Sequence, residues 1–418
     1  MIHGEKMEKN LQKKKSCIIE YYLPFYIMLA PYKFGIIDLG TIGLIICAFL
    51  MLLRENGRIV FKKSQAVFFT FLGYAIIKNI FNLFLGDNSF DTIFNKVTAF
   101  TVIFILCIFV TAFDFDEDAL FKAYKFAGVI FSAGLIYQLI NVYAFGAQVT
   151  PISIIPGYVL RGEVAEESVR PSSFFAEPAS YVTAMLPLEF LSLKKLDYKW
   201  AGFSTVMILA STSTVGVVLS AVLWLTVLGS NKVKFKSKAV IAVFIAVICT
   251  AFFTLNIFSG GNEKLKEVLD GKSTVNSRIV VGFDTIATMD PVKLIFGENY
   301  NDQNTYIREN IGLLRPDSPV KDYIKDGGHI FLNTFCRLIF DYGIIGLIIF
   351  LYIYIKRLRT PNYGAKPFII MSLIAIFAQS SLLNSIFFMN IMLLMLFDTK
   401  LEKELYDEDR SCNYAVCE

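Results

Sequence analysis

Long apolar runs recur along nearly the whole chain of 418 residues. A helix needs about 20 consecutive apolar residues to cross the hydrocarbon core of a bilayer, and about twelve segments approach that requirement, the two beside Thr214 being short. We therefore expect an all-α, polytopic integral membrane protein with about twelve transmembrane helices. The expected spans are 17–34, 36–53, 65–85, 93–113, 124–146, 178–193, 200–213, 215–229, 239–258, 330–355, 366–382 and 385–398.

The composition agrees with a lipid bilayer as the surrounding medium. Apolar side chains make up 55% of the chain and charged ones only 18%, which is too apolar for a soluble globular protein of this size. The net charge of +4 does not indicate a nucleic acid partner, because membrane proteins carry Lys and Arg on their cytoplasmic connections. We therefore expect the lipid bilayer, and no nucleic acid, as a partner.

The distribution of Lys and Arg predicts the orientation. If the basic N-terminal tail, residues 1–16, is cytoplasmic, four connections rich in Lys and Arg also lie in the cytoplasm, as the positive-inside rule requires. Both termini are then cytoplasmic, with a C-terminal tail at 399–418 whose acidic part, 402–418, is expected to be disordered. The expected organisation is transmembrane segments at 17–258 and 330–398, with larger extracytoplasmic loops at 147–177 and 259–329.

Several function classes find no support in the sequence. No Gly-rich phosphate-binding loop and no cytoplasmic domain of useful size is present, which argues against an ATP-driven pump. The seven cysteines show neither a zinc-binding spacing nor a disulfide framework. We expect no metal and no cofactor.

The second large loop contains a candidate amphipathic helix. Asn276 and Ser277 are expected to cap a helix that runs to Met289, with its apolar residues on one face, lying on the outer membrane surface. Arg278 then falls in the first turn, where free backbone N–H groups and the helix dipole favour an anion. The alternative is an arginine that only extends its charge toward the lipid head groups.

The first large loop ends in the sequence RPSSFFAEPA, at 170–179. Arg161 and Arg170 both lie in this loop and are candidates for binding an anion. Pro178 is suited to the first position of a helix, which makes Glu177 the expected cap residue, where the helix dipole stabilises a carboxylate. We interpret Glu177 as a partner for an arginine rather than as a general base.

Polar residues also begin the tenth expected span. His329, Asn333, Arg337 and Asp341 are four residues apart, so a helix starting there would place them in one stripe, with Arg337 and Asp341 neutralising each other. Such a stripe either joins helices or forms a functional site. Lys78 and several amides lie at the same expected depth, and the resulting outward-facing polar cavity suits an anionic lipid head group better than an ion crossing the membrane.

In these segments the chain resembles the bacterial O-antigen polymerase and O-antigen ligase superfamily. The resemblance covers most of the chain and rests on four marks in the family order. They are RPSSFFAEP at 170–178, LASTSTVG at 209–216, NSRIVVGFDTI at 276–286 with IFGENY at 295–300, and GGHIFLNTFCRLIFDYGIIG at 327–346.

The resemblance implies an integral membrane glycosyltransferase of the bacterial cytoplasmic membrane, acting on its outer face. A glycan would leave its polyprenyl pyrophosphate and be attacked by a sugar hydroxyl, without a metal ion. Arg170 and Arg278 match the pyrophosphate-binding arginines, and His329 corresponds to a histidine beside the acceptor or the leaving group. We expect these three residues to be catalytic. The substrate-binding residues would be Arg161, Glu177, Asn333, Arg337 and Lys78.

The resemblance favours a polymerase of lipid-linked repeat units, for O-antigen or capsule, over a ligase. In the ligase pattern a histidine directly precedes the amide residue, whereas here Leu332 precedes Asn333 and His329 stands three residues earlier. A polysaccharide chain-length regulator is a further expected partner. A ligase that moves finished glycan to a lipid or protein remains an alternative, as does a lipid-linked oligosaccharide flippase or another secondary transporter.

Overall fold

The structure is a computed structural model. It describes residues 18–34, 37–57, 59, 61–85, 90–113, 115–147, 149–156, 158, 160, 170–229, 238, 242, 274–298, 303–315, 318, 320–321, 324, 330–361, 363–382 and 384–415. Of residues 82–85, 90–97, 274–278 and 402–415 it describes only the backbone. The expected span at 239–258 therefore lies almost entirely outside the described residues.

Helices make up most of the described backbone, which confirms the predicted all-α class. The strands among the described residues are one pair of two-residue antiparallel strands, with Lys33 opposite Asp38. The elements are α2 (Ile18–Tyr22), η1 (Leu23–Phe25), α3 (Tyr26–Leu29), β1 (Lys33–Phe34), β2 (Ile37–Asp38), α4 (Leu39–Arg54), η2 (Lys63–Gln65), α5 (Ala66–Leu85), α6 (Phe90–Val110), α7 (Glu117–Phe145), α8 (Pro178–Lys194), α9 (Tyr198–Ala210), α10 (Thr214–Leu228), α13 (Thr274–Ala287), α14 (Pro291–Phe296), α15 (Gln303–Glu309), η3 (Ile311–Leu313), α17 (Thr334–Arg359), α18 (Lys366–Ala378) and α19 (Ser385–Ala415).

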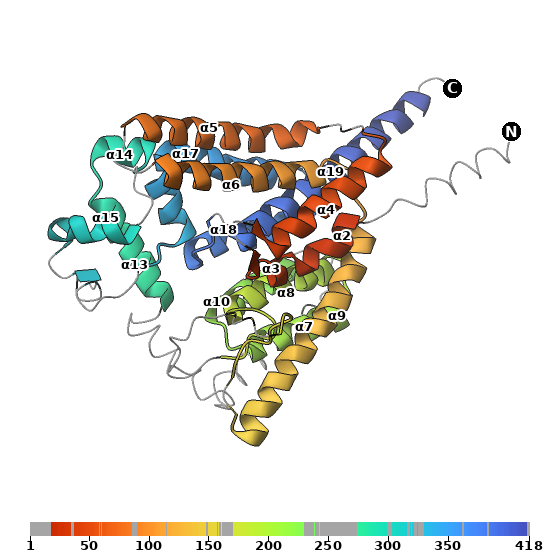
Figure 1. Ribbon diagram of the computed structural model, residues 1–418. Helices are drawn as coiled ribbons and strands as arrows, with labels where there is room; N and C mark the ends of the chain where they lie inside the picture. Colours follow the sequence, from red (N-terminus) through yellow and green to blue (C-terminus); the bar gives the residue numbers. More distant parts are fainter. Residues whose placement is uncertain are drawn as a thin grey trace.

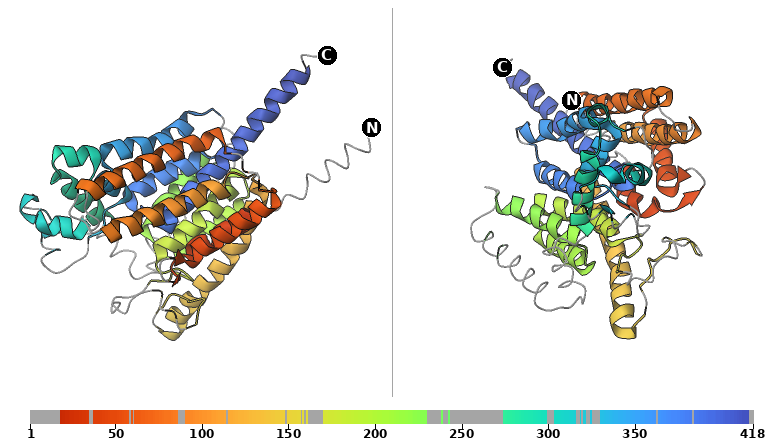
Figure 2. Two further views of the ribbon diagram at one scale, coloured as in Figure 1. Left: turned by 45° about the horizontal axis from the view of Figure 1, so that its top comes forward. Right: turned by 90° about the vertical axis from the view of Figure 1, so that its left-hand side faces the viewer.

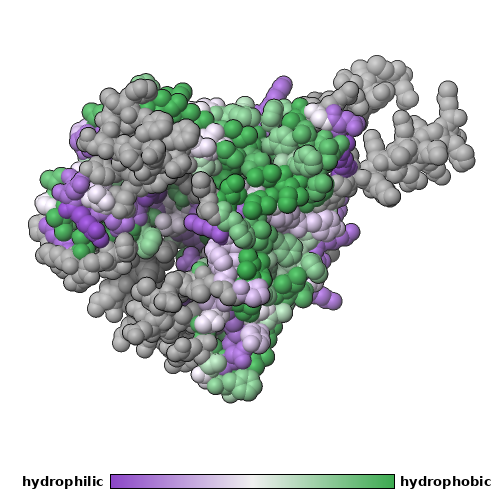
Figure 3. Space-filling model, in the orientation of Figure 1, coloured by the Kyte–Doolittle hydropathy of each residue, from purple (hydrophilic) through white to green (hydrophobic). Residues whose placement is uncertain are grey.

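Three of the described helices are long and apolar enough to cross a membrane: Lys63–Phe81, Glu117–Phe145 and Thr334–Arg359. Five more apolar helices are shorter, among them Thr214–Leu228. At about 1.5 Å per residue, α9 and α10 rise only about 20 Å each, less than the roughly 30 Å of hydrocarbon in a bilayer. Helix length and composition thus support a membrane protein. Hydrophobic residues cover much of the face seen in Figure 3, and polar ones gather near α15.

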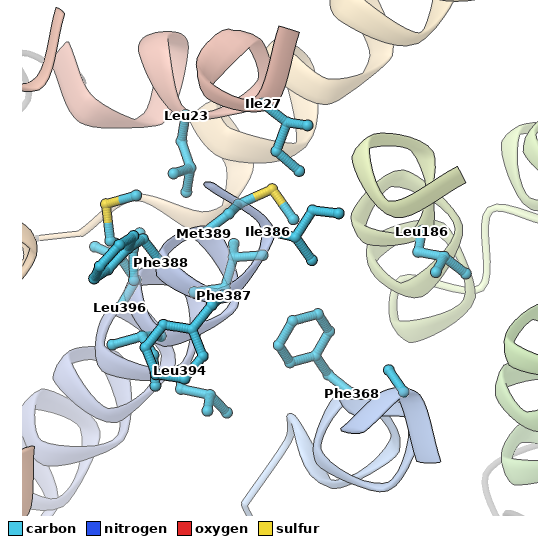
Figure 4. Packing of buried hydrophobic residues seen from close by; sticks show 14 of the residues in the cluster. Leu23, Ile27, Leu186, Phe368, Ile386, Phe387, Phe388, Met389, Leu394 and Leu396 are labelled. Carbon is cyan, nitrogen blue, oxygen red and sulfur yellow. The ribbon is translucent and has the colours of Figure 1, made fainter. Parts of the chain in front are cut away.

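The core of the bundle forms around α19. Its residues from Ile386 to Phe397 are nearly all buried, and they pack against α3, α6, α17 and α18. Figure 4 shows Phe387, Phe388 and Met389 of this helix beside side chains from the N-terminal helices and Phe368 of α18. A helix that is apolar on all sides is suited to the centre of such a bundle.

The helix bundle has two ends, which differ in their polar contacts. At the lysine end, defined by Glu117, Lys194 and Lys400, the starts of α2 and α7 meet the end of α8 and the middle of α19. At the loop end, defined by Ser173, Thr334 and Gln379, the starts of α8 and α17 meet the end of α18. Helices α13, α14 and α15 lie at this second end (Figures 1 and 2).

Three details differ from the expectations. Helix α13 begins at Thr274, so Asn276 and Ser277 lie inside it and Arg278 is past the first turn, since nothing in Thr274–Val275 opposes a helical backbone. Helix α17 begins at Thr334 rather than at 330, because Asn333 caps it. The tail predicted to be disordered continues α19 as a helix to Ala415.

Candidate functional site

The RPSS segment, residues 170–173, passes over α7 beside Phe131 and Gln138 before the chain enters α8. Arg170 and Glu177 are exposed, whereas Pro171, Ser172 and Ser173 are buried. Ser173 adopts a left-handed conformation with φ +57° and donates a 2.7 Å hydrogen bond to the Phe131 carbonyl. Contacts with α7 thus fix the buried residues of the segment, and the exposed Arg170 lies at its edge.

Glu177 and Pro178 start α8 as the sequence predicts. Glu177 is the N-cap residue with an extended backbone, and Pro178 takes the first helical position, where its missing N–H has no cost. The Glu177 side chain makes no capping hydrogen bond to the helix. Its carboxylate therefore stays available at the surface, a few residues from Arg170.

The start of α17 forms a buried polar junction with the unwound end of α18. Thr334 donates through both its backbone N–H (2.8 Å) and its hydroxyl (2.7 Å) to the Gln379 carbonyl, and the Ser381 N–H donates to the Thr334 hydroxyl at 2.9 Å. The Gln379 amide donates in turn to Thr183 of α8 at 3.3 Å. This junction connects α8, two turns after the RPSS segment, with the start of α17.

Asn333 caps α17 and is fully buried. Its Oδ1 accepts the Cys336 N–H at 2.8 Å, which satisfies one of the free donors of the first turn. Its Nδ2 has no hydrogen-bond partner among the described residues. A buried amide with unmet donors is unusual, and Asn333 therefore has hydrogen-bonding capacity left for a ligand, as does the buried hydroxyl of Ser172 among the described residues.

Helix α13 packs against this same start of α17. Gly282 lies so close that a Cβ there would be 2.6 Å from the Cys336 Sγ, so only glycine fits. Position 278 lies one turn earlier on the same helix face. The buried face of α13 also holds Asp284, whose Oδ1 accepts a 2.9 Å hydrogen bond from Arg315 Nε. The helix thus buries a small and polar face, while Phe283 of its apolar face is 47% exposed.

Arg337 connects α17 with α15. Its Nε donates to Asp341 at 2.6 Å, which confirms the predicted pairing of these two residues, and its Nη1 donates to Gln303 Oε1. The Gln303 amide also donates to the Ile330 carbonyl, and the Ile330 N–H donates to Asn304 Oδ1 at 2.6 Å. Two neighbouring amides of α15 therefore hold the main chain just ahead of α17.

Lys78 of α5 is buried and holds the segment that follows α14. Its Nζ donates a 2.7 Å hydrogen bond to the Glu298 carbonyl, while the Glu298 N–H donates to the Phe340 carbonyl at 2.6 Å. The Glu298 carboxylate is buried and pairs with Lys293 at 2.8 Å. Partial burial lowers the pKa of the Lys293 ammonium, but the Glu298 carboxylate more than offsets this effect and the pKa is raised overall.

The structure thus brings four of the predicted site residues, Lys78, Glu177, Asn333 and Arg337, to the loop end together with Arg170. Arg161 and His329 lie outside the described residues, and of Arg278 only the backbone is described. Whether these residues bind substrate or catalyse a reaction stays a prediction. Within the described part of the chain, no group of three or more His, Cys, Asp or Glu side chains is placed to hold a metal ion.

The sequence-based list missed a buried acid in α8. Glu189 is fully buried, and its Oε1 accepts hydrogen bonds of 2.6 Å from both Thr205 of α9 and Ser220 of α10. No ion pair joins it to a basic side chain among the residues described. A glutamate within the apolar run of an expected span was the available signal, because an ionisable residue there needs an explanation.

A cavity of about 290 Å³ lies away from these residues, at the lysine end. Phe190, Leu223 and Tyr363 line it together with Lys194. It shares no residue with the loop end.

Comparison of the chain with protein-family models, with curated proteins and with solved structures found no match.

Proposed function

We propose that the protein is a membrane-embedded glycosyltransferase that polymerises lipid-linked oligosaccharide repeat units into a surface polysaccharide. The observation that supports this proposal most is the meeting of three separate sequence segments at the loop end. The first turns of α8, which directly follow the RPSS segment, are connected there with α17 and α13 through the contacts of Thr183 with Gln379, of Gln379 with Thr334, and of Gly282 with Cys336.

The charges at the loop end suit a pyrophosphate on a lipid. Arg170 is exposed at the edge of the RPSS segment, and Arg278 belongs to the face of α13 that packs on α17. A guanidinium group binds two phosphate oxygens through two parallel N–H groups. This geometry suits the pyrophosphate head group of the lipid-linked glycan. The same groups stabilise the charge that develops when the pyrophosphate leaves.

In the proposed reaction an acceptor sugar hydroxyl attacks the anomeric carbon of the lipid-linked glycan. A bond forms between that oxygen and the anomeric carbon, while the bond from the carbon to the phosphate oxygen breaks and polyprenyl pyrophosphate leaves. The acceptor proton passes to His329, which we propose as the base. We propose that Asn333, whose Nδ2 has no hydrogen-bond partner among the described residues, orients a sugar hydroxyl.

The proposal includes the membrane arrangement. Three described connections rich in Lys and Arg lie toward the lysine end: Arg54–Lys63, Lys194–Lys199 and Lys356–Lys366. Because such connections favour the cytoplasmic side, we assign the lysine end to the cytoplasm and the loop end to the outer face. The side of α13 that carries the exposed Phe283 and the half-buried Ile279 then meets the lipid head groups, as an interfacial helix requires.

The experiment is glycan length in cells that carry Arg170→Ala or Arg278→Ala at normal protein levels. Shortened polysaccharide is expected for both variants, whereas Arg308→Ala, an exposed arginine of α15 in the same loop, should keep full-length polymer. Unchanged long polymer in Arg278→Ala cells would overturn the assignment. Purified protein in detergent should also extend lipid-linked repeat units, which a flippase or other transporter would not do. Polymerised but unattached glycan in a deletion strain would indicate the ligase instead.

A further inference from the structure

We propose that Gln138 of α7 is a positioning residue that sets the conformation of the RPSS segment and thereby presents the Arg170 guanidinium to the pyrophosphate. The inference rests on the proposed function, because Arg170 is taken there as a pyrophosphate ligand. Gln138 is buried and its amide is fully hydrogen-bonded to backbone groups, so it acts through the backbone that it holds.

The Gln138 amide uses its whole hydrogen-bonding capacity on two loop segments. Its Oε1 accepts the N–H groups of Ser172 (2.9 Å) and Ser173 (2.6 Å). Its Nε2 donates to the carbonyls of Thr150 (2.6 Å) and Ser173 (3.3 Å). A primary amide offers two lone pairs and two N–H groups, so among neutral side chains only an amide satisfies this set of partners, and asparagine is one methylene shorter.

The conformation that Gln138 holds is a strained one. Ser173 has φ +57°, a left-handed conformation that costs a non-glycine residue about 1 kcal/mol or more. Its carbonyl also accepts the Ile152 N–H at 2.8 Å, and Gly134 of α7 leaves room for its hydroxyl, since a Cβ at 134 would collide with it. A strained turn of this kind persists only because its surroundings determine it from several sides.

Little freedom remains between this turn and Arg170. Pro171 is buried, its ring fixes its own φ, and it restricts the preceding residue, Arg170, to extended backbone conformations. Once Ser172 and Ser173 are fixed by Gln138, the direction in which the Arg170 side chain leaves the backbone is fixed as well. Loss of the amide would let the turn relax and displace the guanidinium.

Two variants of Gln138 separate its contacts. Gln138→Met keeps the length of the side chain and removes all four hydrogen bonds. Gln138→Glu keeps the acceptor for Ser172 and Ser173 but turns an oxygen toward the carbonyls of Thr150 and Ser173. The matched control is Asn141→Leu, since among the described residues this amide, one turn away, donates to the Tyr137 carbonyl of its own helix, at 3.0 Å.

The test measures binding of farnesyl pyrophosphate, as the probe, to purified protein in lipid nanodiscs. We expect Arg170→Ala and Gln138→Met each to weaken binding about tenfold or more in protein that is folded at the assay temperature, with Gln138→Glu in between. Asn141→Leu should bind as the wild type does. In the Arg170→Ala background, Gln138→Met should cause no further loss, because both changes remove the same contact. A purely structural role would give additive losses.

A nitroxide spin label attached through Arg170→Cys reads the position directly. Its spectrum should show increased mobility when Gln138→Met is added, and no change with Asn141→Leu. Weakened binding in Arg170→Ala together with wild-type binding and an immobile label in Gln138→Met would overturn the inference and leave the proposed function standing. Wild-type binding in Arg170→Ala with a mobilised label in Gln138→Met would instead support the positioning and overturn the pyrophosphate assignment.

Discussion

Gly343 and Gly297 meet main chain to main chain, so closely that a Cβ on Gly343 would lie 2.6 Å from the Gly297 amide nitrogen. Both residues have positive φ, +69° and +92°. Gly343 breaks the regular backbone of α17, and the Glu298 N–H and the Tyr74 hydroxyl donate to the carbonyls of Phe340 and Tyr342 beside the break. The chain after α14 thus fits into an interruption of a helix long enough to span a membrane.

Gly343→Ala should destabilise the protein by roughly 3 kcal/mol, because φ +69° with ψ −178° is a conformation almost restricted to glycine and the new methyl group would strike the segment after α14. Thermal unfolding in detergent measures the change. The control is Gly73→Ala in α5, where no atom lies within 4 Å of an added Cβ. Equal melting temperatures for the two variants would contradict the importance of this contact.

The contact of Lys293 with Glu298 gives a pH dependence. The pKa of Lys293 is raised in the folded protein, so its stabilising contribution is present below its ordinary value of 10.5 and is lost as the pH rises through the folded value. The melting temperatures of wild type and Lys293→Met should therefore differ by a constant amount from pH 7 to about pH 10 and converge above it. Lys199→Met, at an exposed lysine, should not change the profile. A difference that persists undiminished to pH 12 would count against the ion pair.

Glu189 should tolerate replacement of its carboxyl group by an amide but not loss of the oxygen that accepts its hydrogen bonds. A charged carboxylate without a basic partner is very unfavourable in the bundle, so we expect Glu189 to be a neutral acid. The carbonyl oxygen of an amide would accept the hydrogen bonds from Thr205 and Ser220 as well as the oxygen of that acid does. Glu189→Gln is expected to cost less than about 1 kcal/mol, and Glu189→Leu about 1–3 kcal/mol, since it leaves the hydroxyls unpaired. Thermal unfolding of both variants decides this. If Gln destabilises as much as Leu, the bundle requires the carboxylate itself.

The buried pair of Arg357 and Asp398 fastens the end of α17 to α19. The Arg357 Nε donates to both Asp398 oxygens at 2.9 Å, Tyr363 donates to the same carboxylate at 3.0 Å, and the guanidinium lies over the Phe68 ring. Asp398→Ala alone should cost about 3–5 kcal/mol, because it strands a buried charge. Replacing both residues, with Arg357→Met and Asp398→Leu, should recover much of that loss in the same unfolding measurement. A double variant as unstable as Asp398→Ala would show that the pair contributes net stability.

The sequence predicted the helices better than their contacts. Apolar runs set the positions of α5, α8 and α18 to within a few residues, because length and hydropathy are local properties. The pairing of Arg337 with Asp341 was also predictable, since the spacing of four residues brings the side chains together within one helix. Nothing local, however, indicates that Gln303 would be the second partner of Arg337, because α15 lies in a different part of the chain.

The break at Gly343 and the inward face of α13 were beyond sequence reasoning for a similar reason. A glycine in an apolar run is common in membrane helices, and only the approach of Gly297 explains this one. In α13 the periodicity correctly separated an apolar from a polar face, but which of them meets the protein depends on the surroundings. Asp284 lies on the buried side because Arg315 and Ser318 meet it there.

Helix α19 continues without interruption from the core of the bundle through the lysine end and on to Ala415, where it stands clear of the other helices (Figures 1 and 2). Its 31 residues correspond to a rod of about 46 Å. A helical protein fused in phase after Ala415 would therefore be held rigidly to the core rather than tethered to it. Such a fusion supplies the fixed mass outside the micelle that aligning images of a 47.2 kDa membrane protein by electron cryo-microscopy requires.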